Sequence, residues 1–157
     1  AADRVLNMLN GILEGKGTEK VGAIRADLQK AMEADMQVFR TDETIRAALA
    51  TIAELEERYK NISIQDKGKR FNLDLLEAVE LGFLIELAKV MSVGALHRKE
   101  SRGGHYREDF PKRDDVNFMK HSMVYLDPES EFEGVKGLRF ETKPVVYTRY
   151  EPKERKY

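Results

Sequence analysis

The stretch that decides the fold is LDLLEAVELGFLIELAKVMSVGALH, from Leu73 to His97, the most apolar part of the chain. A helix that is apolar on several sides lies at the centre of a bundle or is covered by something else. Asn72, directly before it, is a suitable capping residue. We therefore predict a long helix here, against which the rest of the chain packs. Its apolar positions cover more than one face: Leu75, Leu76, Val79, Leu81, Phe83, Leu84, Ile85, Leu87, Val90 and Met91.

Three shorter helical patterns come before this segment. An apolar cluster over 5–13 ends at Gly15-Lys16-Gly17, and an apolar stripe with three-four spacing follows over 21–39. Another stripe covers 45–59, after the capping signal Thr41-Asp42. We predict a mainly α fold, an antiparallel three-helix bundle (spectrin-repeat-like) with a short leading helix. The methionines on these stripes are expected in the core: Met8, Met32, Met36 and Met91.

After Ser101 the pattern changes, because glycines and prolines interrupt the rest of the chain. We predict a helical bundle over 1–100 and an irregular tail with short β-strands over 101–157. Asp114-Asp115 is expected to cap a short helix that runs to about Lys120. Strands are expected over 123–126, 138–142 and 145–150. The last seven residues, 151–157, are charged and lack apolar periodicity.

The composition excludes several classes of function. There are 157 residues, with 27 Lys and Arg against 28 Asp and Glu, so the basic excess of nucleic-acid binders is missing and no nucleic-acid partner is expected. The absence of cysteine excludes disulfides, thiolate chemistry and iron–sulfur ligation by this chain. The sequence contains no run of about 18 apolar residues, so no membrane-spanning segment is expected. Because the sequence opens on Ala1 with neither Met nor a signal-peptide pattern, we expect it to begin inside a longer chain.

Ionisable side chains are concentrated between His97 and His121, around a glycine-containing loop. Loops held by a rigid scaffold often carry function. One interpretation is a metal site of His105, Asp109 and His121, although nearby arginines and lysines would repel a cation and no helical histidine spacing occurs. A second is acid–base catalysis by His105 with Glu108 or Asp109, although no nucleophile motif accompanies them.

Two further interpretations use the same segment differently. The backbone N–H groups of Gly103-Gly104 and the guanidinium of Arg102 or Arg107 are suited to bind an anion. Alternatively, the segment is a charge-paired loop that packs against another domain, with Phe110-Pro111 and Phe118 as apolar contacts. The near-equal mix of charges favours pairing over anion capture, so the chemistry favours an interface and leaves the other three interpretations open.

The order of residues in this segment resembles a known family. Residues 98–111, RKESRGGHYREDFP, are similar to the R-x-E-S-R-G-x-H-x-R-x-D-[FY]-P stretch of succinate dehydrogenase and fumarate reductase flavoproteins. Arg113-Asp114-Asp115, Phe118 and Lys120-His121-Ser122 match the family's R-D-D…[WFY]-x-K-H-[ST] pattern. The chain end over 143–157 resembles the actinobacterial members in particular.

The resemblance covers nearly the whole chain, because Leu73–Ala78 also fits the family. L-aspartate oxidase shares a shorter version of the central motif, but the K-H-[ST] element and the R-Y-x-P-x-x-R-x-Y ending fit succinate dehydrogenase better. The resemblance therefore identifies the chain as similar to the C-terminal helical domain of the flavoprotein subunit.

The resemblance also implies a function for the parent chain. That chain would oxidise succinate to fumarate, or run the reverse reaction, by hydride transfer to a covalently bound FAD. Electrons would pass to an iron–sulfur subunit and, through a membrane anchor subunit, to a quinone. The complex would lie peripherally on the cytoplasmic face of the plasma membrane, and the isolated domain would be soluble.

The family's flavin and substrate motifs lie upstream, and this sequence contains no G-x-G-x-x-G. We therefore expect no catalytic, cofactor-binding or metal residue, no cofactor in this chain, and a non-catalytic scaffold role. The alternatives are the C-terminal domain of L-aspartate oxidase and a stand-alone helical module that binds a carboxylate or a partner protein. The residues predicted to contact the flavin-binding domain are Arg98, Arg102, His105, Arg107, Asp109, Arg113 and Asp114.

Overall fold

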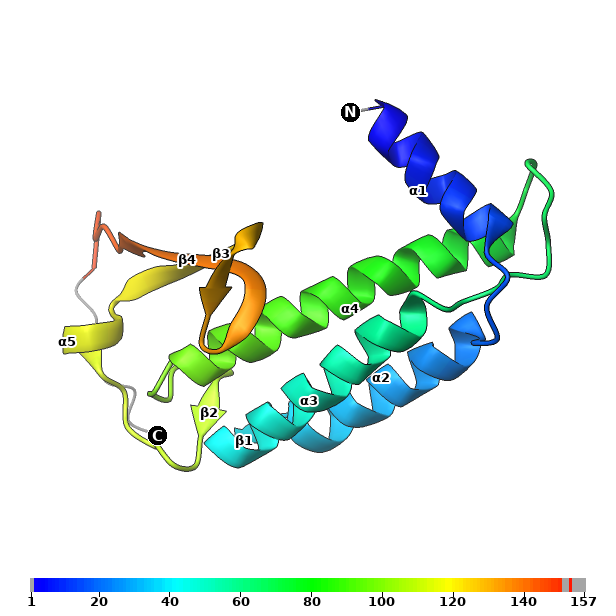
Figure 1. The fold of residues 1–157 in the computed structure, drawn as a ribbon. Coiled ribbons are helices and arrows are strands. Elements are labelled where there is room, and N and C mark those ends of the chain that lie inside the picture. The colour runs from blue at the N-terminus through cyan, green and yellow to red at the C-terminus, as the bar shows by residue number, and fades with distance from the viewer. Residues whose placement is uncertain (1, 151–152, 154–157) are drawn as a thin grey trace.

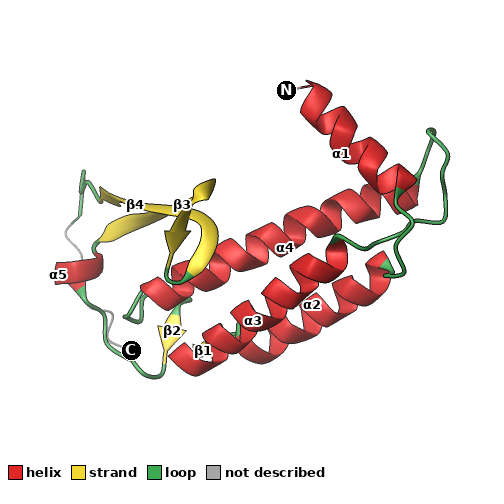
Figure 2. Ribbon diagram, in the orientation of Figure 1, coloured by secondary structure: helices red, strands yellow, loops and turns green. Residues whose placement is uncertain are grey.

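The computed structural model describes residues 2–150 and 153. The fold is mainly helical with a few short strands, as the sequence predicts (Figure 2). The elements in chain order are α1 (Ala2–Glu14), α2 (Val21–Asp35), β1 (Phe39–Arg40), α3 (Asp42–Tyr59), α4 (Leu73–His97), β2 (Tyr106–Arg107), α5 (Asp115–Phe118), β3 (Lys120–Phe132) and β4 (Val135–Pro144).

Helices α2, α3 and α4 lie side by side (Figure 1). Gly82 lets α3 approach α4 closely, because a Cβ at this position would lie 2.8 Å from the Tyr59 hydroxyl oxygen. That hydroxyl donates a hydrogen bond to the Ala78 carbonyl at 2.8 Å, which satisfies the polar end of a half-buried ring. The aliphatic core between the three helices includes Ile24, Leu28, Ile52, Leu55, Leu81 and Ile85.

The predicted helix starts at Thr41 and Asn72 are confirmed. The Thr41 side chain accepts a hydrogen bond from the Thr44 backbone N–H, and the Thr44 hydroxyl accepts one from the Thr41 N–H, forming a capping box at the start of α3. Asn72 Oδ1 accepts from the Leu75 N–H at the start of α4. Each cap satisfies backbone donors that the first turn of a helix leaves unpaired.

Helix α4 is buried on one side and exposed on another. Its buried side includes Ala78, Leu81, Ile85 and Ala88, which face α2 and α3. Large apolar side chains on a second stripe stay exposed, at helical spacing. We call this stripe the apolar face; it consists of Leu73, Leu76, Phe83, Leu84, Leu87 and Met91.

Helix α1 stands away from the other helices and meets α4 near the start of α4 (Figure 1). Ile12 of α1 joins the core, whereas Val5, Leu6 and Met8 are exposed. The prediction that all four stripe methionines are core residues is correct for the buried Met36 and partly correct for Met32, which packs against the core. It is wrong for Met8 and Met91, because no other element in the described part of the chain covers the stripes that carry them.

The tail folds into an antiparallel hairpin of β3 and β4, longer than the predicted strands. The hairpin packs on the end of α4 through the ring of His97, which lies 5.1 Å from Phe132 and 4.2 Å from Phe140, centroid to centroid. The strand predicted over 145–150 is wrong: β3 begins at Lys120, opposite Pro144, and the backbone just before Lys120 forms α5, so it offers no strand to pair with residues beyond Pro144.

Two other expectations from the sequence concern the end of a helix and the end of the chain. The stripe predicted over 21–39 stops at Asp35, because Phe39–Arg40 leaves the helix and pairs as β1, in parallel, with Tyr106–Arg107 of β2. The charged ending predicted over 151–157 lies outside the described residues except for Lys153. Over the described part of the chain, no helix is both long enough and apolar enough to cross a lipid bilayer.

Candidate functional site

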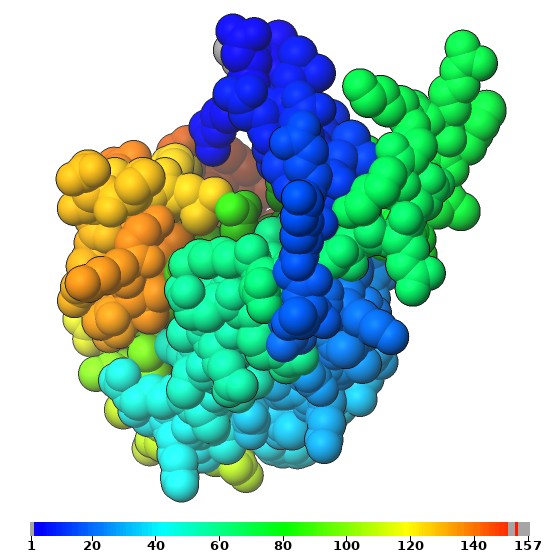
Figure 3. All heavy atoms as spheres, turned by 45° about the vertical axis from the view of Figure 1, so that its right-hand side comes forward, coloured from blue at the N-terminus to red at the C-terminus, as the bar shows by residue number. Residues whose placement is uncertain are grey.

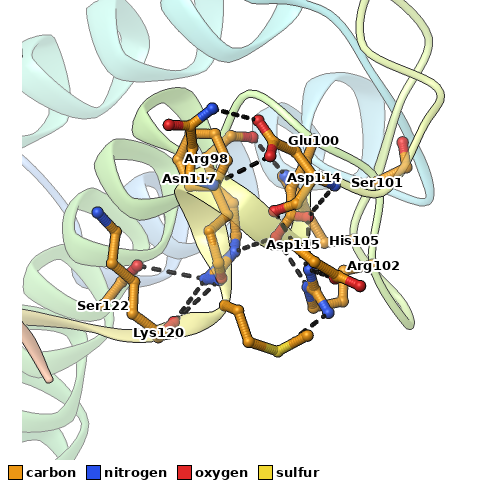
Figure 4. Close-up of polar contacts among 12 residues, drawn as sticks. Arg98, Glu100, Ser101, Arg102, His105, Asp114, Asp115, Asn117, Lys120 and Ser122 are labelled. Carbon is orange, nitrogen blue, oxygen red and sulfur yellow. Dashed lines mark hydrogen bonds and ion pairs between the residues drawn. The ribbon is translucent and has the colours of Figure 1, made fainter. Parts of the chain in front are cut away.

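The residues from Arg98 to Asp115, which we call the charged segment, follow the C-terminus of α4 and pack around a buried carboxylate (Figure 4). Glu100 has a fully buried side chain at the centre. Its Oε1 accepts from Arg98 Nε at 3.1 Å and from Arg102 Nε at 2.9 Å. Its Oε2 accepts from Arg102 Nη2 at 2.9 Å and from the Asp114 backbone N–H at 2.8 Å. Two guanidiniums and a backbone donor therefore compensate one buried charge.

Arg98 connects this carboxylate to the start of the tail. Its Nη2 donates to the Lys120 carbonyl at 3.0 Å, and its Nη1 donates to Ser122 Oγ at 3.3 Å (Figure 4). Because β3 begins at Lys120, one guanidinium fixes the position of the hairpin relative to Glu100. Five guanidinium N–H groups in a planar fork suit arginine to such a junction.

Arg102 joins Glu100 to the short helix α5. Its Nη2 donates to Asp115 Oδ1 at 2.6 Å, and Asp115 Oδ2 accepts from Arg113 Nη2 at 2.8 Å. The hydrogen bonds to Glu100 raise the pKa of the Arg102 guanidinium, with a smaller contribution from Asp115. Asp114 caps α5 by accepting from the Val116 and Asn117 backbone N–H groups.

A second network surrounds Arg107, whose side chain is fully buried. Its Nη1 donates to the Ala95 and Leu96 carbonyls, at 3.0 and 3.1 Å, at the C-terminus of α4. Its Nε and Nη2 donate to the two carboxylate oxygens of Asp109, each at 2.7 Å. These hydrogen bonds lower the pKa of Asp109 to about 2.

Asp109 connects this network to another helix. Its Oδ2 also accepts from the Asp42 backbone N–H at 3.0 Å, at the N-terminus of α3. The Arg107 guanidinium therefore lies at the negative end of the α4 dipole, and the Asp109 carboxylate lies at the positive end of the α3 dipole. Both placements are favourable. The Arg107–Asp109 pair fastens the segment to two helix ends at once.

His105 lies beside both networks with both ring nitrogens occupied. Nδ1 accepts from Arg40 Nη1 at 3.1 Å, and Nε2 donates to the Arg98 carbonyl at 2.9 Å, an arrangement that requires a neutral ring protonated on Nε2. Burial lowers the pKa of His105, and the positive charges of Arg40, Arg107 and Arg98 lower it further, against the raising effect of the Arg98 carbonyl. The ring is thus held as a neutral bridge.

The structure brings the seven predicted interface residues together at one end of the helices, but their described contacts are made within the chain. Arg107 has no exposed surface, so it cannot itself touch a partner and acts by holding the segment's shape. Whether the partly exposed members contact another domain stays a prediction. Those members are Arg98, Arg102, His105, Asp109, Arg113 and Asp114.

The same contacts bear on the other interpretations. The guanidiniums of Arg102 and Arg107 are each paired with carboxylates of this chain, which leaves neither free to grip an anion without breaking those pairs. Across the described residues, no group of three or more His, Asp or Glu side chains is placed to hold a metal ion. The segment is therefore best described as a charge-paired structural element.

Glu100 is the residue that sequence reasoning missed. Its spacing from Arg98 and Arg102, two residues on each side, was visible in the sequence. Nothing in that spacing shows that the carboxylate is buried, because the burial depends on α5 and the Asp114 backbone closing over it.

Comparisons with known proteins agree on the family. A family model described as the C-terminal part of fumarate reductase flavoproteins matches residues 25–157. The fumarate reductase flavoprotein subunit of Haemophilus influenzae is 35% identical over 99% of this chain and 25% of its own length. The 8-methylmenaquinol:fumarate reductase flavoprotein subunit of Wolinella succinogenes is 40% identical over 93% of this chain and 23% of its own.

A solved structure of the E. coli quinol fumarate reductase flavoprotein shares the fold, with a TM-score of 0.87 and 35% identity over 98% of this chain and 26% of that one. The chain thus spans about a quarter of the length of the curated relatives it matches. With a family model that covers most of its residues, this chain belongs to the succinate dehydrogenase/fumarate reductase flavoprotein family and corresponds to the C-terminal domain of those proteins.

Proposed function

We propose that this chain is a non-catalytic scaffold that packs against the flavin-binding part of a succinate dehydrogenase or fumarate reductase flavoprotein. The parent protein would interconvert succinate and fumarate through a covalently bound FAD and exchange electrons with an iron–sulfur subunit and a membrane-bound quinone. It would act as a peripheral subunit on the cytoplasmic face of the plasma membrane. Family membership and the names of the relatives support this assignment.

The observation that carries the scaffold role is the apolar face of α4. Leu87 is 58% exposed and Met91 is 55% exposed, on the same helix whose other side forms the core. A row of large exposed apolar side chains on one helix marks a surface that another protein surface covers. In the proposed assembly, α2, α3 and α4 act as one antiparallel three-helix bundle that presents this face to the flavin-binding part.

Two domains are implied by this role. The bundle over 1–100 would present the apolar face, and the tail over 101–157 would fix the end of α4 and support the same contact. The networks around Glu100 and Arg107 fit such a division, because they tie the tail to the ends of α3 and α4. The exposed members of the charged segment would lie at the edge of the contact, where charged groups stay partly hydrated.

The first experiment compares this chain with a flavoprotein of the relatives' length that carries its sequence. We expect the isolated chain to bind no FAD and to reduce no dye with succinate, whereas the long protein does both. Clear succinate-dependent turnover by the isolated chain would contradict the scaffold role. The reading frame of the gene is a simpler check: several hundred preceding codons with a glycine-rich dinucleotide motif support the proposal, and a start codon near Ala1 contradicts it.

The second experiment changes the apolar face in the long protein. Leu87→Glu places a charge in the proposed contact, so we expect a marked loss of thermal stability and of retained flavin. Glu57→Ala, at an exposed position on α3, is the matched control and should change neither quantity. Unchanged stability and flavin content in Leu87→Glu would show that this face contacts nothing.

A further inference from the structure

The loop before α4 carries an aromatic side chain with no partner among the residues that the structure describes. Phe71 is completely exposed, and its backbone φ is +51°, in the left-handed region. A bulky residue is unfavourable there, and glycine or asparagine would fit better. Phe71 is therefore strained and unburied at once, so it contributes nothing to the stability of this chain.

The loop nevertheless has a fixed shape. The Asn72 side chain donates to the Asp66 and Gly68 carbonyls, each at 2.8 Å, while also capping α4. Asp66 Oδ1 accepts from the Gly68 N–H at 2.7 Å, and Asp74 Oδ2 accepts from the N–H groups of Gln65 and Asp66. Strained residues persist where surrounding contacts determine them, and such sites cluster at binding surfaces. A loop already held in one shape also loses less entropy when it binds.

Three cationic side chains and a single carboxylate, Asp66, lie within the five residues before Phe71. Lys67, Lys69 and Arg70 precede it, and none of the three takes part in an ion pair with the described residues. Lys67 Nζ donates to the Gly15 carbonyl at 3.2 Å, which places the loop next to the end of α1. Figure 3 shows the loop projecting from the molecule beside α1. An exposed phenyl ring beside cationic side chains that have no ion-pair partner among the described residues fits an apolar pocket bordered by carboxylates.

We propose that Phe71 inserts into an apolar pocket on the flavin-binding part of the parent protein, with carboxylates around it that pair with Lys67, Lys69 and Arg70. This inference rests on the proposed function. The flavin-binding part is chosen as the partner because Phe71 lies within five residues of Leu73 and Leu76, the exposed side chains that begin the apolar face. The curated relatives are also about four times as long as this chain, so the same polypeptide supplies a large surface.

The test measures how fast a cysteine at position 71 is alkylated. This chain has no cysteine, so Phe71→Cys gives a single reactive thiol in the isolated chain, and peptide mass spectrometry resolves the same site in the long flavoprotein. Leu87→Cys reports on the apolar face, and Glu57→Cys is the exposed control. We expect alkylation at positions 71 and 87 to be at least tenfold slower in the long protein, with position 57 unchanged.

The outcomes separate this inference from the proposed function. Protection at position 87 with full reactivity at 71 would overturn the Phe71 contact and leave the scaffold role intact. Protection at neither position would overturn both. Protection at 71 without protection at 87 would support the Phe71 contact and contradict the role of the apolar face. Protection at 71 only after an iron–sulfur subunit is added would assign the contact to another partner, against the proposal.

A second variant tests the same contact without chemical labelling. Phe71→Gly relieves the left-handed strain, so the thermal midpoint of the isolated chain should stay the same or rise. The thermal midpoint of the long flavoprotein should fall, because the pocket loses the phenyl ring that fills it. Phe71→Trp keeps an aromatic ring there, so this variant should retain most of the stability. An equal change of midpoint in both proteins after Phe71→Gly would contradict the proposal.

Discussion

Arg107 and Leu87 reverse the usual distribution of side chains in a protein. Arg107 is fully buried, hydrogen-bonded to the end of α4 and paired with Asp109, whereas Leu87 is 58% exposed on the longest helix. The charged segment around Arg107 is satisfied within the chain, and the apolar face around Leu87 is not. A dense group of charges therefore need not be the part of a domain that meets its partner.

The largest expected effect comes from breaking the buried charge pair. Arg107→Ala removes the donors to the Ala95 and Leu96 carbonyls and leaves Asp109 without its cation. Removing one partner of a buried ion pair typically costs about 3–5 kcal/mol, so urea unfolding of the isolated chain should show a loss of that order. Arg113→Ala, whose pair with Asp115 is partly exposed, should cost less than about 1 kcal/mol. Equal losses in the two variants would show that the burial of Arg107 adds nothing to the stability of its ion pair.

A smaller loss is expected at the centre of the other network. Glu100→Gln keeps the shape of the side chain but removes the negative charge between Arg98 and Arg102. Hydrogen bonds to charged groups contribute about 1.5–3 kcal/mol, so unfolding free energy should fall by roughly 2 kcal/mol. Glu57→Gln, at an exposed carboxylate, is the matched control. If the Glu100→Gln variant were as stable as the unsubstituted chain, the buried negative charge would not be needed for stability.

The stability of the charged segment depends on pH. The folded-state pKa of Asp109 is lowered to about 2, so its pairing with Arg107 stabilises the chain above the ordinary carboxyl pKa. This contribution is lost as the pH falls from near 4 towards 2. The folded-state pKa of His105 is also lowered, so its contribution disappears as the pH falls below about 6.5.

Chemical denaturation at a series of pH values measures both losses. Asp109→Asn should reduce the decrease at the acid end, and His105→Asn should reduce the decrease that begins near neutral pH. Stability that rises on acidification through either range would contradict the assigned contacts, because protonating His105 places a positive ring against Arg40.

The smallest effects are expected on the apolar face. Leu84→Gln and Leu87→Gln remove side chains that touch little of this chain, so each should change the unfolding free energy of the isolated chain by no more than about 0.5 kcal/mol. Leu81→Ala, on the buried side of the same helix, should cost about 2–5 kcal/mol. Similar losses at positions 84 and 81 would mean that the exposed stripe is not a separate surface.

The parts of the fold that could be predicted are those set by local sequence. The caps at Thr41 and Asn72 and the helices that follow them depend on residues within a few positions, so their signals are readable. The pairing of Phe39–Arg40 with Tyr106–Arg107 could not be predicted, because it joins segments more than sixty residues apart. The burial of Glu100 and Arg107 depends on the same kind of distant packing.

The role predicted for the site, contact with another domain, stays a prediction. The seven residues chosen from Arg98 to Asp114 do gather in one place, since they lie close together in sequence. Composition cannot show whether charged side chains point to one another or to a partner. The exposed side of α4 had a clearer signal, because a helix that is apolar on several sides needs more covering than two neighbouring helices supply.

The most direct measurement of the central difference uses native methionines of this chain. Met91 lies on the apolar face and is 55% exposed, whereas Met36 is buried in the core at 5%. Peptide mass spectrometry after brief peroxide treatment gives the oxidation rate of each sulfur. We predict that Met91 oxidises much faster than Met36 in the isolated chain and that Met91 becomes as protected as Met36 in the long flavoprotein. Met91 oxidation at the same rate in both proteins would contradict the proposal that this face is covered by the flavin-binding part.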